Sequence, residues 1–299
     1  MMSRSVAVRF GKGAGILVLV SFVLAPFAMT LLASMTPDAA LISRPPSWFS
    51  HGFTLDNYRY ILTGEVPAQY LTTDGSRSFS MISEEIRRLP HSMLNSTVVA
   101  LVVMTINLVF ACAAAYAIGR LKFRGKLASF NFLMGSRLIP AVAIAIPYYG
   151  LMQSLALTNN LLALILIHVA MTLPFSILFL IASFRRIDRS IEEAAQLDGL
   201  NPLQTLLRIV IPLARPALVG AALFSFMLSY SEFLFGLLLA SNQDVRTLPV
   251  TLASVAVNPD VSLGLITAGI VLGIAPTLLV IVPIWRFMIR GLAEGATKG

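Results

Sequence analysis

Charged residues are scarce in this chain, and their scarcity excludes an ordinary soluble domain. Asp, Glu, Lys and Arg make up 12% of the 299 residues, whereas hydrophobic residues make up 57%. A typical soluble domain carries about 25% charged residues. We therefore expect an integral membrane protein.

Metal-binding and disulfide-forming side chains are also few. The single cysteine, Cys112, lies in an apolar run, which excludes a disulfide framework and a thiolate metal site. The three histidines, His51, His91 and His168, stand far apart and lack the spacing of metal ligands. The sequence predicts no metal and no other cofactor.

Several motifs of catalysis and nucleotide binding are missing as well. The chain has no GxxxxGK[ST] segment, so it does not itself bind ATP in the manner of a phosphate-binding loop. It also lacks GxSxG and HExxH, which mark two large classes of hydrolase. We therefore predict that the chain is not an enzyme.

The chain does contain long apolar runs. Six of them approach or exceed the roughly 20 residues that a helix needs to cross a bilayer. The first run follows three basic residues but is longer than the core of a signal peptide, so we expect a retained membrane anchor. The six predicted spans are residues 14–35, 94–118, 131–154, 161–183, 216–240 and 262–285.

The basic residues are distributed unequally between the connections, and this predicts the orientation. Sixteen of the 22 Lys and Arg residues fall on the side of the two chain ends, including Arg137 in the second connection, and six fall on the other side. Because basic residues gather on the cytoplasmic side, both termini are predicted to be cytoplasmic. This placement also explains the net charge of +8 without a nucleic acid partner.

These spans predict the organisation of the chain: an all-α integral membrane protein with six transmembrane helices. The predicted parts are a cytoplasmic N-terminal arm (1–13), a first transmembrane helix (14–35), an extracytoplasmic segment (36–93), a five-helix core (94–288) and a cytoplasmic tail (289–299).

The stretch 190–217, on the predicted cytoplasmic side, has the signals of a helix-turn-helix. Ser190 with Glu193 and Asn201 with Gln204 have the spacing of two capping boxes, each of which marks a helix start. Between them Gly199 can adopt the positive φ that ends a helix. The local pattern alone is equally typical of a plain hairpin between two spans.

Glu232 is the one carboxylate well inside a predicted span. Because an intramembrane charge normally faces a bundle interior or a wet cavity, Glu232 is a candidate for the transport path, with Tyr230 and Ser231 beside it. A structural carboxylate held by a neighbouring helix is the alternative. Asn95, at the start of the second predicted span, is a further path candidate, although hydrogen bonding between helices would explain it equally well.

Together these residues resemble a known family. Glu193-Ala194-Ala195, Asp198-Gly199 and Pro212 follow the EAA loop of permease subunits in binding-protein-dependent ABC importers. Further similarities, such as YAIGRLKFRGK from residue 116 and RGLAEGATKG from residue 290, match the carbohydrate-uptake branch and, within it, the maltose-permease G type. The chain departs from the family at Tyr230 and Ser231, where Trp-Asn is frequent.

The resemblance implies a function and a set of partners. It implies a multi-pass permease of the bacterial inner membrane that forms, with a second and different permease subunit, the path for a sugar, polyol or related carbohydrate. Two ATPase subunits would hydrolyse ATP and an extracytoplasmic binding protein would deliver the solute. Coupling to the ATPase would use the EAA loop residues, namely Glu193, Ala194, Ala195, Asp198, Gly199 and Pro212.

Three other functions remain open from the sequence. The cargo could be a solute other than a carbohydrate. An ion-driven secondary transporter would have to use Glu232, and the lack of other intramembrane carboxylates argues against it. A membrane scaffold or receptor without transport would rely on the long segment 36–93.

Overall fold

The computed structural model describes residues 2–45, 48, 52–66, 83–259 and 261–296, with side chains described between residues 12 and 283. Every regular element in these residues is helical, which confirms the all-α prediction. Parts of the predicted extracytoplasmic segment, including His51, and the last three residues of the predicted tail lie outside the described residues. The chain forms two units, Met1–Pro90 with Thr251–Ile274 and His91–Val250 with Ala275–Gly299.

The first unit contains the N-terminal helices and a return from late in the chain. Its elements are α1 (Met2–Ser34), α2 (Asp38–Ile42), α3 (Asp56–Thr63), the short 3-10 helix η2 (Ile86–Arg88), the first residues of α4 (Leu89–Arg120), most of α13 (Leu248–Ala256) and the start of α14 (Leu263–Ala296).

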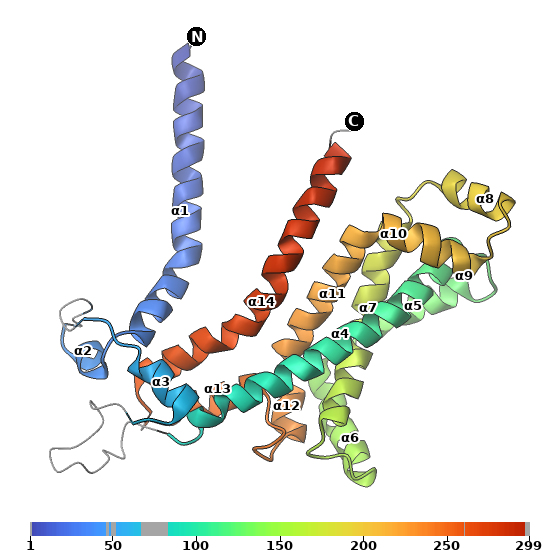
Figure 1. Cartoon of the computed structure of the whole chain (residues 1–299). Coiled ribbons are helices and arrows are strands. Elements are labelled where there is room, and N and C mark those ends of the chain that lie inside the picture. The colour runs from blue at the N-terminus through green and yellow to red at the C-terminus, as the bar shows by residue number, and fades with distance from the viewer. Residues whose placement is uncertain (1, 46–47, 49–51, 67–82, 260, 297–299) are drawn as a thin grey trace. The chain divides into compact units, whose positions relative to one another are not determined.

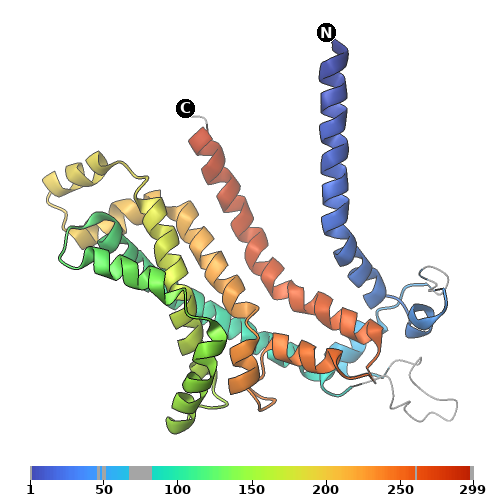
Figure 2. The ribbon, with the colours of Figure 1, turned by 180° about the vertical axis from the view of Figure 1, so that it is seen from behind.

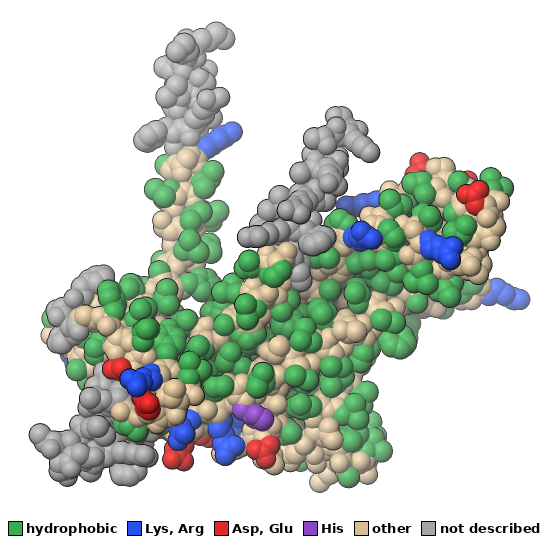
Figure 3. Space-filling model, viewed as in Figure 1, with side chains coloured by type: hydrophobic (Ala, Val, Ile, Leu, Met, Phe, Trp, Pro, Cys, Tyr) green, Lys and Arg blue, Asp and Glu red, His purple; other side chains and the backbone are tan. Residues whose placement is uncertain are grey.

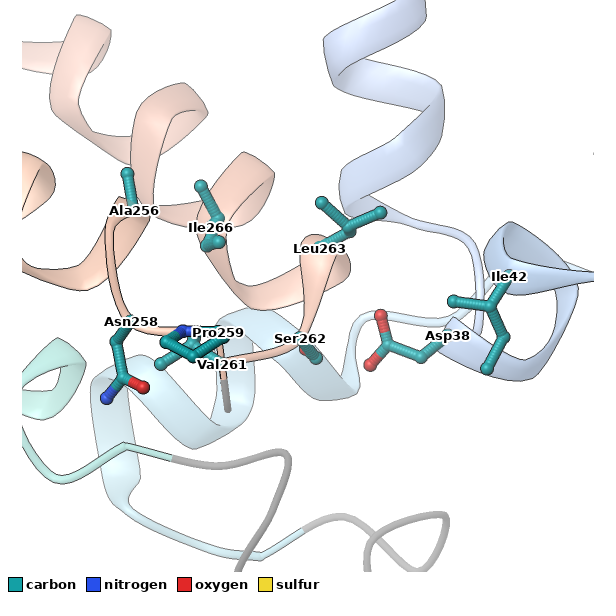
Figure 4. Close-up of a pocket in the computed structure, with 9 residues that line it drawn as sticks. All are labelled: Asp38, Ile42, Ala256, Asn258, Pro259, Val261, Ser262, Leu263 and Ile266. Atoms are coloured by element: carbon teal, nitrogen blue, oxygen red, sulfur yellow. The ribbon is translucent and has the colours of Figure 1, made fainter.

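Asp38 joins the two parts of the first unit. Its buried carboxylate accepts a hydrogen bond from the backbone N–H of Gly264 at 2.9 Å, in the first turn of α14. Figure 4 shows this carboxylate directed toward that turn, beside Ser262 and Leu263. A Cβ atom at Gly264 would lie 2.6 Å from Nδ2 of Asn57, so only glycine allows this approach. The start of α14 is therefore held by a residue from the other end of the sequence.

We expect Asp38→Ala to lower the stability of the first unit by about 1 to 2 kcal/mol, because the Gly264 N–H loses its acceptor at a helix start. Hydrogen exchange at the first amides of α14 would measure the loss. Glu84→Ala, at an exposed carboxylate of the same unit, is the matched control and should leave that exchange unchanged. Equal effects of the two substitutions would contradict the proposed role of Asp38.

The second unit holds most of the predicted core. Its elements are the remainder of α4, then α5 (Lys126–Ser136), α6 (Ala141–Ser154), α7 (Leu161–Phe184), α8 (Arg189–Leu197), α9 (Pro202–Thr205), the π-helical turn η3 (Leu206–Val210), α10 (Ile211–Leu213), α11 (Arg215–Tyr230), α12 (Leu234–Leu239), the start of α13 and the later part of α14.

Four helices of the described chain are long and apolar enough to cross a membrane, and two bent pairs bring the number to six if each pair is one span. The four are Lys12–Ser34, Ile86–Arg120, Leu161–Phe184 and Leu263–Pro283, and the pairs are Lys126–Ser136 with Ala141–Ser154 and Pro202–Leu213 with Arg215–Tyr230. The number of predicted spans therefore agrees with the upper value, although two spans are not continuous helices.

The predicted third span, residues 131–154, is broken. Its two helices meet at 95°, with Arg137 to Pro140 between them, because proline disfavours a helical residue before it and ends α5. The predicted fifth span, 216–240, is also interrupted, since α11 ends at Tyr230 and α12 begins at Leu234. The prediction that Glu232 lies inside a continuous helix is therefore wrong.

The core of the second unit is built from close helix contacts. Small residues of α4, among them Ala111 and Ala115, are fully buried against Leu180 and Phe184 of α7 and Val210 of η3. Small side chains allow helix backbones to approach closely in a membrane, where van der Waals packing drives association. This packing fixes the positions of α4, α7 and the turn that leads into α11.

Figures 1 and 2 show α8 at one end of the second unit and α6 and α12 at the opposite end. On the face seen in Figure 3, charged side chains gather over α8 to α10, whereas the side chains along the middle of α4 are hydrophobic. An apolar zone between polar ends is what a bilayer requires. The EAA loop and the break at Glu232 thus belong to different parts of this unit.

Candidate functional site

The EAA loop forms the predicted helix, turn and helix, but its first helix starts differently. The side chain of Asp188 accepts the N–H of Ser190 at 3.0 Å and caps α8, so the capping box predicted from Ser190 and Glu193 is wrong. Asp188 lies two residues before Ser190 in the sequence and is an equally good N-cap residue, which explains why α8 starts earlier than predicted. This hydrogen bond also holds the pKa of the Asp188 carboxyl below its usual value.

The turn and the second helix match the sequence prediction. Gly199 has a φ of +84°, the left-handed conformation that glycine adopts without steric strain. Asn201 and Gln204 form a complete capping box, with Pro202 in the first turn of α9. Pro212 lies in α10, before an 85° bend into α11. The loop therefore has a defined geometry at every turn.

A buried ion pair that the sequence analysis did not predict joins α8 to the core. Nε of Arg120, at the end of α4, lies 2.8 Å from Oε1 of Glu192, and both side chains are under 10% exposed. The Tyr116 hydroxyl donates to Oε2 of Glu192 at 3.3 Å, and Arg120 also donates to the carbonyl of Ile187. Glu192, the neighbour of the predicted coupling residue Glu193, therefore holds α8 in place.

The predicted coupling residues are mostly on the open side of α8. Glu193, Ala194 and Asp198 are exposed, whereas Ala195 is buried and Pro212 is half-buried. Leu197, at the last position of α8, is 90% exposed. A group of exposed leucines on a polar loop is typical of a protein contact surface. The same loop contributes the exposed residues Ile191, Leu203 and Leu207.

Glu232 lies at the break between α11 and α12, where its carboxylate has several partners. It accepts hydrogen bonds from the backbone N–H of Phe235 at 3.0 and 3.1 Å and of Gly236 at 3.2 Å. Its Oε2 also lies 3.2 Å from Nε2 of His168 in α7. These contacts make Glu232 the residue that starts α12 and joins it to α7.

Polar side chains of three helices continue from Glu232 into the unit. Nδ1 of His168 lies 2.8 Å from the hydroxyl of Ser229 in α11. One turn further, Nδ2 of Asn107 in α4 donates to the hydroxyls of Thr172 at 2.5 Å and Ser225 at 2.7 Å. His168 and Asn107 thus form hydrogen bonds between helices.

The other path candidates lie apart from the Glu232 carboxylate. Tyr230 is buried, with its ring stacked on Phe226 at 5.5 Å, and the hydroxyl of Ser231 donates to the carbonyl of Met227. The amide of Asn95 donates to the carbonyls of Asp244 and Arg246, at 2.9 and 3.1 Å, and thus ties α4 to the segment before α13. Of the four candidates, Glu232 alone lines the pocket described next.

A pocket of about 190 Å³ opens between α7, α11 and the break after α5. Its lining includes Glu232 and also Arg137, which the charge count had placed in a cytoplasmic connection. In the structure its guanidinium contacts Met171 and Phe175 in the middle of α7. The remaining lining residues are His168, Met171, Thr172, Phe175, Leu228 and Ser229. Among the described residues, no group of three or more His, Cys, Asp or Glu could hold a metal ion.

The chain is similar to permeases of known transport systems. The trehalose/maltose transport system permease protein MalG of Thermococcus litoralis is 27% identical, over 95% of both chains. The sulfoquinovosyl glycerol transport system permease protein SmoH of Agrobacterium fabrum is 29% identical, over 92% of this chain and 88% of the relative. A bacterial ABC transporter involved in the import of the acidic polysaccharide alginate shares the fold, with a TM-score of 0.72 at 22% identity over 93% of this chain and 96% of that chain.

The sequence profile of one family matches residues 108–290, a segment that contains the EAA loop, the Glu232 break and the pocket. That segment is more than half of the chain. The chain belongs to the family of binding-protein-dependent transport system inner membrane components.

Proposed function

We propose that this chain is one of two permease subunits of an ATP-binding-cassette importer for a saccharide. The second permease subunit, a different chain, completes the path across the membrane. Two ATPase subunits bind at the cytoplasmic side and hydrolyse ATP, and a binding protein delivers the cargo to the extracytoplasmic segment, residues 36–93. Both termini lie in the cytoplasm. The chain itself transports and does not catalyse a reaction.

The observation that carries this proposal is the construction of α8. One side of the helix is fixed to the core through the buried Arg120–Glu192 ion pair, and the other presents Glu193, Ala194 and the 90% exposed Leu197. A short helix that is rigidly held and presents an exposed leucine and a small alanine beside polar residues suits a docking element. Its exposed side is better suited to binding in a cleft of an ATPase subunit than to remaining in solvent.

The same ion pair supports a route for coupling. Closure of the ATPase dimer on ATP displaces α8, and Arg120 transmits this displacement to the end of α4, a helix that spans the membrane. The π-helical turn and the bend at Ala214 pass it to α11. Motion of packed helices as rigid bodies is an established form of coupling between distant sites.

The saccharide cargo is supported by the relatives. The two permeases described above are named for trehalose/maltose and sulfoquinovosyl glycerol, and the structural relative imports alginate. The diacetylchitobiose uptake system permease protein DasC of Streptomyces coelicolor, 25% identical over the full length of both chains, has a cargo of the same class. All four cargoes contain sugar rings, although their charge and length differ.

We expect Gly199→Trp to abolish binding of the ATPase subunits and uptake. The turn at Gly199 is open, with no atom of this chain within 4 Å of an added Cβ, so a large side chain there would collide with a docked partner. Copurification of the ATPase from membranes and saccharide uptake by vesicles would measure the two effects.

Gly125→Trp is the matched control for this experiment. Gly125 also has a left-handed φ, +91°, and also has no atom within 4 Å of an added Cβ, so both substitutions introduce the same backbone strain. Gly125 lies between α4 and α5, outside the EAA loop. Unchanged ATPase binding and uptake in Gly199→Trp, or equal losses in both variants, would refute the proposed coupling role.

A further inference from the structure

Arg137 places a positive charge in the middle of the membrane-spanning part of the chain. It follows α5 at the 95° break, and its Nη1 donates to the carbonyl of Met171 at 2.5 Å. Met171 and Phe175 are the central residues of α7, about ten residues from either end. At 1.5 Å per residue that is roughly 15 Å, half the thickness of a hydrocarbon core.

The guanidinium is held in place by groups that do not neutralise it. Its central carbon lies 3.6 Å from the centroid of the Phe175 ring, in a cation–π contact. Nη1 donates to the Met171 carbonyl, whereas Nε of Arg137 is buried and has no hydrogen-bond partner among the described residues. Within the described residues no carboxylate forms an ion pair with Arg137.

Glu232 is the carboxylate of the same pocket, but among the described residues no ion pair joins it to Arg137. It is engaged by His168 and by the N–H groups of Phe235 and Gly236. Charged residues at mid-membrane are unfavourable and normally have a partner or a functional reason. Arg137 is therefore a candidate for a functional charge, since it has no ion-pair partner among the described residues.

The pocket beside Arg137 has the chemistry of a saccharide site with a charged end. The hydroxyls of Thr172 and Ser229 and the imidazole of His168 line it, with both nitrogens of His168 already hydrogen-bonded within the protein, and Leu228 adds an apolar surface. Its volume of about 190 Å³ is below the roughly 300 to 1,000 Å³ of complete ligand pockets. Such a pocket fits one ring, or one end of a longer saccharide, in a path completed by the second subunit.

We propose that Arg137 binds an anionic substituent, a carboxylate or a sulfonate, on the saccharide cargo. Guanidinium groups bind such anions through two parallel N–H donors, and Arg137 is a guanidinium that lines the pocket. Nη1, bound to Met171, fixes the orientation of the group. This inference rests on the proposed function, because it names the charge class of the saccharide.

The test compares two sugars that differ in one substituent. Glucuronate and glucose have the same ring, but only glucuronate carries a carboxylate. Binding of each to the complete transporter in lipid nanodiscs would be measured by isothermal titration. We expect wild type to bind glucuronate at least tenfold more tightly than glucose, and Arg137→Gln to remove this preference while changing the affinity for glucose less than twofold.

Two further variants keep the test decisive. Arg137→Lys retains the charge without the fork, so it should keep a reduced preference for glucuronate even if Arg137→Gln fails to assemble. Arg124→Gln, at an exposed arginine between α4 and α5 and outside the EAA loop, should leave the preference unchanged. A purely structural role of Arg137 would alter assembly or both affinities, but not their ratio.

The outcomes separate this inference from the proposed function. Equal affinity of wild type for the two sugars, or a glucuronate preference that survives in Arg137→Gln, would overturn the role of Arg137 and leave saccharide transport in place. If neither sugar binds and no saccharide is imported, the proposed function itself fails.

Discussion

Glu192→Leu is expected to lower the free energy of unfolding of the second unit by about 3 to 5 kcal/mol, since it leaves Arg120 charged and buried without its carboxylate. The Arg120 side chain is 4% exposed, so water cannot take the place of Glu192. The Tyr116 hydroxyl loses its acceptor at the same time. Thermal unfolding of the protein in lipid nanodiscs would measure the effect.

A double variant separates the effect of this ion pair on stability from its effect on coupling. Replacing both partners, with Arg120→Met and Glu192→Leu together, should recover most of the lost stability, because apolar side chains can fill the space of a buried ion pair. Uptake should stay low in this double variant, since α8 would be packed against α4 but no longer tied to it. Glu193→Leu, at the exposed neighbour, is the control; a comparable loss of stability there would contradict the assigned role of Glu192.

Glu232→Ala is the other substitution from which a large effect is expected, about 3 kcal/mol of destabilisation. It removes the acceptor of the Phe235 and Gly236 N–H groups and the partner of His168 in one step. Glu232→Gln keeps an oxygen that can accept the backbone N–H groups, so we expect a loss of about 1 kcal/mol and retained uptake. Both values would come from thermal unfolding together with vesicle uptake assays.

Ser231→Ala provides the comparison for Glu232, because the exposed Ser231 hydroxyl bonds only to the preceding turn of α11, at Met227. It should change neither stability nor uptake. If Glu232→Gln abolished uptake without any loss of stability, Glu232 would be a residue of the transport path and not a structural carboxylate.

The sequence predicted the features that depend on neighbouring residues. The turn at Gly199 and the capping box of Asn201 with Gln204 are local, so their spacing was sufficient. The partner of Glu192 is 72 positions away at Arg120, and no local pattern indicates which buried side chain an acidic residue will meet. The position of Arg120 near the end of an apolar run was the only available signal.

Arg137 shows why counting charges by sequence position was insufficient. It lies eleven residues after Lys126, in a stretch that reads as part of a basic connection. The break at Pro140 turns the chain through 95°, which carries Arg137 to the middle of α7. The break could have been predicted from an arginine followed by a proline within an apolar run, since both residues are unfavourable inside a continuous transmembrane helix.

Helix α1 has a consequence for extracting this protein from its membrane. Only 6% of its apolar window between Lys12 and Ser34 is buried within the described chain, and side chains as large as Phe22 are 79% exposed. A detergent that replaces lipid must therefore cover α1 on every side that this chain leaves open. The quality of a purified sample will depend on how well the micelle solvates this one helix.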